Sequence, residues 1–405
     1  MTEGPLAGVR ILDLSQGAAG PVATMFLGDL GAEIVKVEPP GGEWGRGLGP
    51  PFLEGTAAAF MGMNRNKRGI VVDLKAEGGP DVVARLADAS DVFVESFRPG
   101  VADRLGVGYR ALSGRNPRLV YATISAFGQE GPWRDRPGVD GIVQAIGGLM
   151  SVTGTEDGTP VKVGVPAADM VAGIFASQAI VAAIYARERT GKGQRVDLSL
   201  LESIMAFQVV PISMYLASGE PPRRMGSAAP YSAPNEAFRT ADGWIQVAAY
   251  TPDRWPRLCE ALGMGHLVDD PRFATNAGRV TNRAELHAEL EAIFTTRTTK
   301  EWLAELEAVD VLCGPLLTYP DLLAEDHVER IDVLPRYRHP HLGELRAVRE
   351  PATFSATPAG HRTAAPLRPG EHTREVLAAA GYDQNQIDAL VERGVVATPE
   401  GKEEP

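Results

Sequence analysis

The beginning of the chain alternates between short apolar runs and one helical repeat. Val9 to Leu14 is an apolar run typical of a buried strand, and residues 33–38 (EIVKVE) form a second one. Between them, Pro21 begins a helix that ends near Leu30, because proline suits a first helical turn and Gly31 stops the repeat. Strand, helix and strand in this order predict a parallel sheet with helices on both faces.

The same alternation continues, with strands expected at 69–74, 91–96, 118–126 and 194–200 and helices at 79–87 and 201–216, the latter interrupted at Pro211. A linker rich in Pro, Gly and Ser follows, and then a hairpin at 237–249 and helices at 255–262, 283–294 and 300–309. A strand at 342–353 and a helix at 373–380 end the pattern. We expect an α/β fold whose large Rossmann-like domain, 1–218, is completed by 326–405 and interrupted by a small α+β domain at 219–325.

Composition excludes some partners and favours a compartment. The chain has 405 residues and a net charge of −12, which argues against nucleic acid as a partner. Two cysteines, Cys259 and Cys313, make no disulfide framework and indicate a reducing cytoplasm. The N-terminus lacks the basic and apolar regions of a signal peptide.

One acidic residue stands alone before a long apolar helix. Asp169 follows Val165 and Pro166, and no charged residue occurs from Met170 to Ala186. Its carboxylate could cap the helix, or it could act as a nucleophile toward an acyl group. The helix is rich in small residues and contains Gln178, so we expect a buried core helix rather than a membrane span.

Other chemistries find less support. The loop 16–20 (QGAAG) departs from the dinucleotide motif G-x-G-x-x-G, and Pro21 removes an amide that a phosphate would use, although Glu38 has the expected spacing. The seven histidines are dispersed, so no metal site is predicted. A basic cluster at 64–68 (NRNKR) is either a solvated loop or a phosphate site, and Arg98 and Arg104 add two more cations.

A set of short motifs, in this order and spacing, resembles the class III CoA-transferases, the CaiB/BaiF family: residues 6–14 (LAGVRILDL), 30–38 (LGAEIVKVE), 66–68 (NKR), 73–75 (DLK), 95–100 (ESFRPG), 147–151 (GGLMS), Asp169, 190–194 (TGKGQ) and 370–373 (GEHT). The resemblance covers essentially the whole chain. It implies a Rossmann-like domain made from both ends of the chain, a small inserted domain, and a homodimer whose two subunits interlock like rings.

The resemblance also implies a mechanism and a substrate site. Asp169 aligns with the catalytic aspartate, which would form an acyl anhydride and then an aspartyl-CoA thioester. Coenzyme A and acyl-CoA are substrates, with a carboxylic acid as acceptor and no permanently bound cofactor. By position, the CoA contacts would be Gln16, Ala18, Val72, Lys75, Ser96, Phe97 and Arg104. Asp140 and Tyr231 are candidate substrate contacts, with helix capping as the alternative for Asp140.

Two departures bear on these roles. Gln16 replaces a frequent histidine and Pro39 a basic residue, so the side chains that hold the phosphates stay open. The loop at 225–234 has one glycine where formyl-CoA:oxalate transferases have a run, which argues against oxalate. An α-methylacyl-CoA racemase is the main alternative, but the histidine that it needs before Asp140 is Val139.

Overall fold

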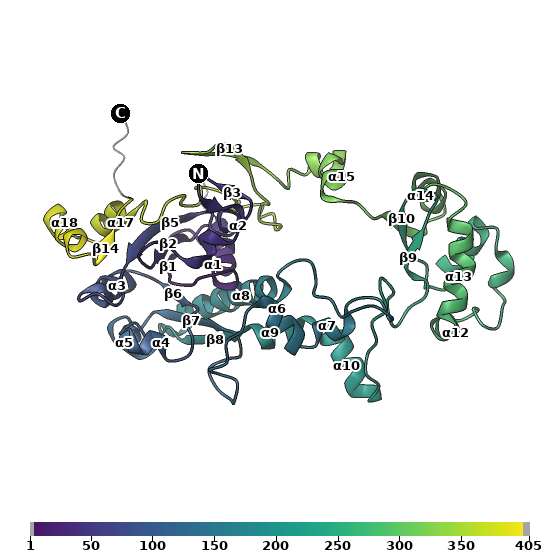
Figure 1. Cartoon of the computed structure of the whole chain (residues 1–405), viewed down its shortest axis with the longest axis horizontal. Coiled ribbons are helices and arrows are strands. Elements are labelled where there is room, and N and C mark those ends of the chain that lie inside the picture. The colour runs from purple at the N-terminus through teal and green to yellow at the C-terminus, as the bar shows by residue number, and fades with distance from the viewer. Residues whose placement is uncertain (1–3, 400–405) are drawn as a thin grey trace. The chain divides into compact units, whose positions relative to one another are not determined.

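The computed structural model describes residues 4–399 and contains two compact units (Figure 1). The first takes in the chain as far as Leu149, then Lys162–Gly219, and then the chain from Asp332 onward. The second consists of Met150–Val161 and Glu220–Ile331. Each unit has its own hydrophobic core.

A seven-stranded sheet forms the centre of the first unit, with strand order β14-β5-β2-β1-β6-β7-β8. All neighbours are parallel except β14, which pairs antiparallel with β5. The strands are β1 (Arg10–Asp13), β2 (Glu33–Glu38), β5 (Lys67–Val72), β6 (Val92–Glu95), β7 (Val120–Ser125), β8 (Arg195–Ser199) and β14 (Val396–Ala397). The six predicted parallel strands are confirmed. The sequence analysis missed β14, because two residues carry no periodicity.

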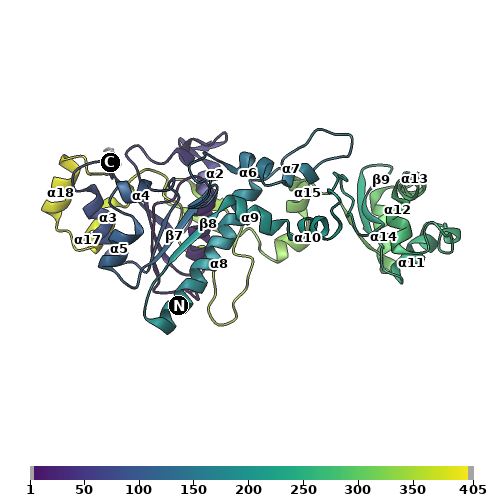
Figure 2. The same ribbon diagram turned by 90° about the horizontal axis from the view of Figure 1, so that it is seen from below.

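Helices cover both faces of this sheet (Figure 2). On one face lie α1 (Ala19–Asp29) and α8 (Ala167–Thr190), with α6 (Asp140–Ile146) and α9 (Leu200–Phe207) beside α8. The other face carries α3 (Gly79–Asp88), α4 (Val101–Arg104), α5 (Tyr109–Arg115), α17 (Thr373–Ala379) and α18 (Gln384–Glu392). Val83, Phe93 and Leu377 are fully buried between that helical layer and the strands.

Helix α8 packs closely on α1, and a glycine makes this possible. A Cβ added at Gly173 would come within 2.7 Å of the Val22 side chain and 2.9 Å of the Ala19 carbonyl. By length and composition α8 could cross a membrane, and so could α9 with α10 (Val209–Ser218) across their 72° bend. The contacts of α8 with α1, α9, β7 and β8 are those of a core helix.

The break between α9 and α10 falls at Gln208, so the predicted interruption at Pro211 was misplaced. Proline lacks a donor N–H, and Pro211 lies in the first turn of α10, where backbone N–H groups have no intrahelical acceptor in any case.

The strand predicted at 342–353 is replaced by a shorter hairpin of β12 (Arg336–His339) and β13 (Gly343–Arg346). Further short elements are β3 (Phe52–Leu53), β4 (Thr56–Ala57), α2 (Ala58–Met63), α7 (Leu149–Val152) and the 3₁₀ turns Trp44–Gly47 and Gly265–Leu267.

The second unit combines a small antiparallel sheet with helices. Its strands are β9 (Asn235–Arg239), β10 (Trp244–Ala248) and β11 (Leu312–Pro315), and its helices are α11 (Arg254–Ala261), α12 (Asn276–Thr281), α13 (Arg283–Phe294), α14 (Thr299–Ala308), α15 (Tyr319–Ala324) and α16 (Asp326–Arg330). The predicted hairpin and three helices are present. Residues 150–161 also lie in this unit rather than in the large domain, because Arg224 donates hydrogen bonds to the carbonyls of Thr155, Glu156 and Gly158.

Candidate active site

The strand order of the first unit creates a crevice between β1 and β6. The chain passes from β1 to β2 in one direction along the sheet and from β6 to β7 in the other. The loops that leave the carboxyl ends of β1 and β6 therefore diverge, and ligands of open α/β sheets bind at such a point. The loop after β1 contains Gln16–Ala18 and leads into α1, which begins at Ala19 rather than at the predicted Pro21. The loop after β6 contains Ser96 and Phe97.

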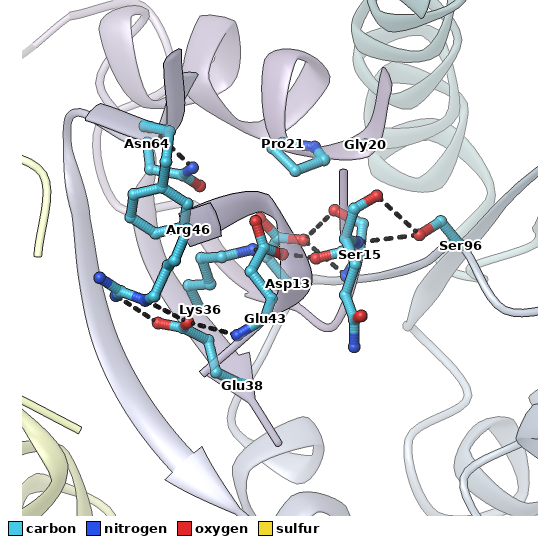
Figure 3. Close-up of polar contacts among 12 residues, drawn as sticks. Asp13, Ser15, Gly20, Pro21, Lys36, Glu38, Glu43, Arg46, Asn64 and Ser96 are labelled. Atoms are coloured by element: carbon cyan, nitrogen blue, oxygen red, sulfur yellow. Dashed lines mark hydrogen bonds and ion pairs between the residues drawn. The ribbon is translucent and has the colours of Figure 1, made fainter. Parts of the chain in front are cut away.

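A pair of hydrogen bonds joins these two loops (Figure 3). The Gln16 N–H donates to the Ser96 hydroxyl at 2.9 Å, and that hydroxyl lies 3.4 Å from the Gln16 carbonyl, to which it donates. The Phe97 N–H donates to the buried Glu95 carboxylate at 2.7 Å. Burial raises the pKa of Glu95 to about 7, against the effect of that hydrogen bond. The backbone of both loops is thus held from within the protein.

Two cavities lie at this crevice and share Gln16 and Phe97 in their walls. The first has a volume of about 320 Å³ and is lined by Gln16–Gly20, Trp44, Ser96–Pro99, Ile124–Ala126, Arg134, Arg136–Val139, Asp169 and Leu200. The second, of about 150 Å³, is lined by Leu14, Gln16, Val37–Pro39, Val72–Lys75, Phe97 and Leu105.

Most of the residues selected from the sequence meet at these cavities. Gln16, Ala18, Ser96 and Phe97 line the first together with Asp169, and Val72 and Lys75 line the second. Arg104 is exposed at the end of α4 and lines neither cavity. Tyr231 is exposed in the second unit and also lines neither.

Asp169 is the third residue of α8 and lies partly buried in the wall of the first cavity. No residue within 4–399 donates a hydrogen bond to its carboxylate. Burial raises the pKa of Asp169 to about 7, and the negative charge of Asp140 adds to the rise. Near neutral pH the carboxylate is therefore a stronger base than an ordinary aspartate, and it has no hydrogen bond from residues 4–399 that a reaction with an electrophile would have to break.

Asp140 lies at the start of α6 and contacts the residue that precedes Asp169. One of its carboxylate oxygens accepts a hydrogen bond from the Ala168 N–H at 2.9 Å, and the other accepts one from Gln144 at 2.8 Å. Gln144 in turn accepts a hydrogen bond from the Val163 N–H at 2.9 Å. Neither Asp140 nor Gln144 lines a cavity, so the geometry favours the capping role over substrate contact for Asp140. Gln144 was not predicted as a partner of Asp140. Its i,i+4 spacing from Asp140 is the signal that could have identified it, because residues four apart on a helix lie next to each other.

The first cavity is cationic in a protein that is acidic overall. Arg98, Arg134 and Arg136 line it, and Asp169 is the one acidic residue among its described lining. Arg134 and Arg136 belong to the loop between β7 and α6, which the sequence analysis did not examine. Their position in a loop that leaves the carboxyl end of a parallel strand is the signal that could have identified them.

The basic cluster at 64–68 fits neither a solvated loop nor a phosphate site. Arg65 and Lys67 are buried and pair with carboxylates, Asp29 for Arg65 and Asp13 for Lys67. Arg68 pairs at the surface with Glu33 and Glu375. All three cations thus form ion pairs within the first unit, two of them buried and one at its surface. Among residues 4–399, no three His, Cys, Asp or Glu side chains gather as metal ligands would.

Comparison with known proteins identifies the family of this chain. Residues 6–373 match the model of CoA-transferase family III. The chain is 38% identical over 400 residues to succinyl-CoA:glutarate CoA-transferase of Mus musculus, which covers 98% of this chain and 92% of the relative. It is 37% identical over 381 residues to succinate--glutarate CoA-transferase of Agrobacterium fabrum, covering 92% and 95%. A CaiB/BaiF family protein from Brucella suis has a similar structure, with a TM-score of 0.83 at 36% identity over 93% of this chain and 100% of that one.

The chain belongs to CoA-transferase family III. It is an enzyme that transfers coenzyme A between an acyl-CoA thioester and a carboxylic acid, as the sequence motifs predicted.

Proposed function

We propose that the reaction proceeds through covalent intermediates on Asp169. The carboxylate attacks the thioester carbonyl, which forms an acyl anhydride and releases CoA thiolate. The thiolate attacks the aspartyl carbonyl of the anhydride, so that an aspartyl-CoA thioester forms and the first acid leaves. The acceptor carboxylate then attacks this thioester, which forms a second acyl anhydride on Asp169 and releases the thiolate. The thiolate attacks the acyl carbonyl of that anhydride, which gives the new acyl-CoA and frees the Asp169 carboxylate. The observation that carries the proposal is the position of Asp169 in the first cavity, without a protein hydrogen bond and with a pKa of about 7.

The shared wall of the two cavities supports a path for the CoA molecule. We propose that the nucleotide end occupies the second cavity, beside Val72 and Lys75, and that the pantetheine arm passes Gln16 and Phe97 toward Asp169. Ala18 and Ser96 would contact the arm in the first cavity. Arg104, exposed on α4, remains a candidate for a phosphate contact.

The acid that the enzyme accepts is proposed to be a dicarboxylic acid. Two relatives named above are called glutarate CoA-transferases, and glutarate has two carboxylates. One carboxylate would become the thioester, and the other needs a cationic partner. Arg134 and Arg136 line the cavity that contains Asp169 and supply guanidinium groups suited to that task.

We also propose that the enzyme is an interlocked homodimer, as the resemblance implies. Helix α10 has no buried residue, and Val209, Val210 and Leu216 are 60%, 50% and 76% exposed. Apolar side chains in this number on one helix are typical of a face that another chain covers. Light scattering after size-exclusion chromatography should give the mass of two chains, and a monomer would contradict the proposal.

The cytoplasm remains the proposed location of the enzyme, because its two cysteines are free thiols, as is usual in a reducing compartment.

Intact-protein mass spectrometry tests the mechanism. The protein is mixed with a panel of acyl-CoA thioesters, beside an Asp169→Asn variant that should still bind CoA. A CoA-sized adduct on the wild type alone, cleaved by hydroxylamine, is the expected result. Absence of the adduct with every donor, while CoA still binds, would move the assignment toward racemase-like proton transfer. Val139 argues against that alternative, because it lines the cavity where a racemase needs a histidine.

A further inference from the structure

A buried network of charged side chains lies directly behind the loop that follows β1 (Figure 3). It contains three carboxylates and three cations, all with side-chain exposures of 8% or less: Asp13, Glu38, Glu43, Lys36, Arg46 and Lys67. Removing charges from water is costly, and well-packed apolar residues often replace such clusters without loss of stability. Stability alone is therefore a poor explanation for this network.

The two lysines of the network hold the two ends of the segment 15–21, which consists of the loop after β1 and the first residues of α1. The Lys36 ammonium donates a hydrogen bond to the Ser15 carbonyl at 2.9 Å, and the Lys67 ammonium donates to the Pro21 carbonyl at 2.9 Å. Asp13 accepts hydrogen bonds from the Ser15 N–H at 2.9 Å and from Lys67 at 3.1 Å. Between these fixed ends lie residues 16–20, and all five of them line the cavity that contains Asp169.

Lys36 also joins this segment to a second part of the cavity wall. Its ammonium donates to the Glu43 carboxylate at 2.9 Å, and Glu43 is followed by Trp44, which lines the cavity. The Glu43 N–H donates to Glu38 at 3.0 Å, so the backbone of this segment is held as well. The ring of Trp44 lies so close to Gly17 that an added Cβ there would come within 2.6 Å of it.

We propose that Lys36 and Lys67 are positioning residues that hold the segment 16–20 and the Trp44 segment in the CoA-binding geometry before the thioester arrives. The inference rests on the proposed function, in which Gln16 and Ala18 contact CoA. A cavity wall that is ordered in advance lowers the entropy cost of binding. It also keeps the thioester carbonyl within reach of Asp169, because small displacements of a reacting group are costly in rate.

The test removes the Lys36–Glu43 pair without leaving a lone buried charge. In the double variant Lys36→Met/Glu43→Gln, the remaining members of the network are still balanced, two carboxylates against two cations. The matched control is Arg65→Met/Asp29→Asn, a buried pair with side-chain exposures of 6% and 0% that lines neither cavity. Titration calorimetry with coenzyme A itself gives the dissociation constant of each protein. Hydrogen exchange of a peptide covering 14–22 reports how firmly the loop is held.

We expect Lys36→Met/Glu43→Gln to weaken CoA binding by about tenfold or more and to speed exchange in 14–22. The control should bind CoA as the wild type does, even where its thermal stability falls. Equal CoA affinity in the wild type and the test variant would overturn the inference. If the wild type itself neither binds CoA nor forms the Asp169 adduct, the proposed function fails instead.

If the test variant does not fold, hydrogen exchange of the wild-type protein tests the inference instead. Slow exchange of the Ser15 and Gln16 amides without CoA would support a loop that is held in advance. Fast exchange of both, becoming slow only when CoA is added, would overturn the inference.

Discussion

Asp140 accepts a hydrogen bond from the backbone N–H of Ala168, the residue immediately before Asp169. The same carboxylate thus fixes the start of α8 and places a like charge beside Asp169, which raises the pKa of Asp169 further. Position and ionisation of Asp169 are therefore set together by a residue that does not line the cavity.

Replacing Asp140 by Asn should separate these two effects. Asparagine can still accept the Ala168 hydrogen bond, but it removes the charge that disfavours the ionised form of Asp169. Adduct formation in the wild type should rise with pH through about 7, where the Asp169 carboxylate ionises. In Asp140→Asn the midpoint should move to lower pH, because a charge that raises the pKa of Asp169 is gone.

The adduct rate measured against pH checks this prediction. Asp88→Asn is the control, because Asp88 is an exposed carboxylate on α3, across the sheet from α8. An unchanged midpoint in Asp140→Asn would show that its charge does not reach Asp169.

The raised pKa of Asp169 also predicts a pH-dependent cost in stability. The fold raises this pKa from 3.8 to about 7, so the fold favours the protonated form. That favourable contribution is complete below the unfolded value and is lost as the pH rises through about 7. Asp169→Asn should therefore gain free energy of unfolding relative to the wild type between pH 4 and pH 7, reaching about 1–3 kcal/mol above pH 7.

Urea unfolding of both proteins at several pH values measures that difference. The gain should grow with pH and then level off. A difference that stays constant over the whole range would mean that the carboxylate is not desolvated in the folded protein.

Gly17→Ala should damage the first cavity, because Gly17 has a φ of +85° and no room for a Cβ beside Trp44. We expect the free energy of unfolding to fall by about 1–3 kcal/mol and CoA to bind at least about tenfold more weakly. Gly47→Ala is the control, since an added Cβ at Gly47 meets no atom within 4 Å. Calorimetry and urea unfolding of the two variants test the expectation, and equal behaviour would contradict it.

Arg134→Met and Arg136→Met should distinguish acceptors by their charge. If these guanidinium groups bind the second carboxylate, the KM for a dicarboxylic acceptor should rise about tenfold or more, while that for a monocarboxylic one changes little. Arg110→Met, an exposed residue of α5 outside both cavities, is the control. Equal losses for both kinds of acceptor would assign the two arginines to CoA instead.

The parts that were predictable from sequence are those with a local pattern. The run from Val9 to Glu38 shows its strand, helix and strand through periodicity, and Asp169 stands out because no other charge is near it in sequence. Gln144 and Asp140 could not be placed, because their contact with 163–168 depends on how α6 docks beside α8.

The burial of Lys36 and Lys67 could not be predicted from the sequence for a similar reason. In EIVKVE, Lys36 has the alternation of a surface residue on a half-exposed strand. Its partner Glu43 and the Ser15 carbonyl come from two other loops. Lys67 likewise pairs with Asp13, 54 residues earlier in the sequence. Pairing of this kind is decided by tertiary packing, which no local periodicity records.

The return of the chain to the first unit has a consequence for protein synthesis. Arg46 donates hydrogen bonds to the carbonyls of Pro366 and Leu367, the former 320 residues away, and β14 covers the edge of β5. A ribosome makes these partners long after the rest of the sheet, so the nascent chain exposes the β5 edge when both parts of the second unit, 150–161 and 220–331, have already been made. The sheet that is translated first is thus completed last, and the β5 edge stays unpaired until the end of the first unit has been made.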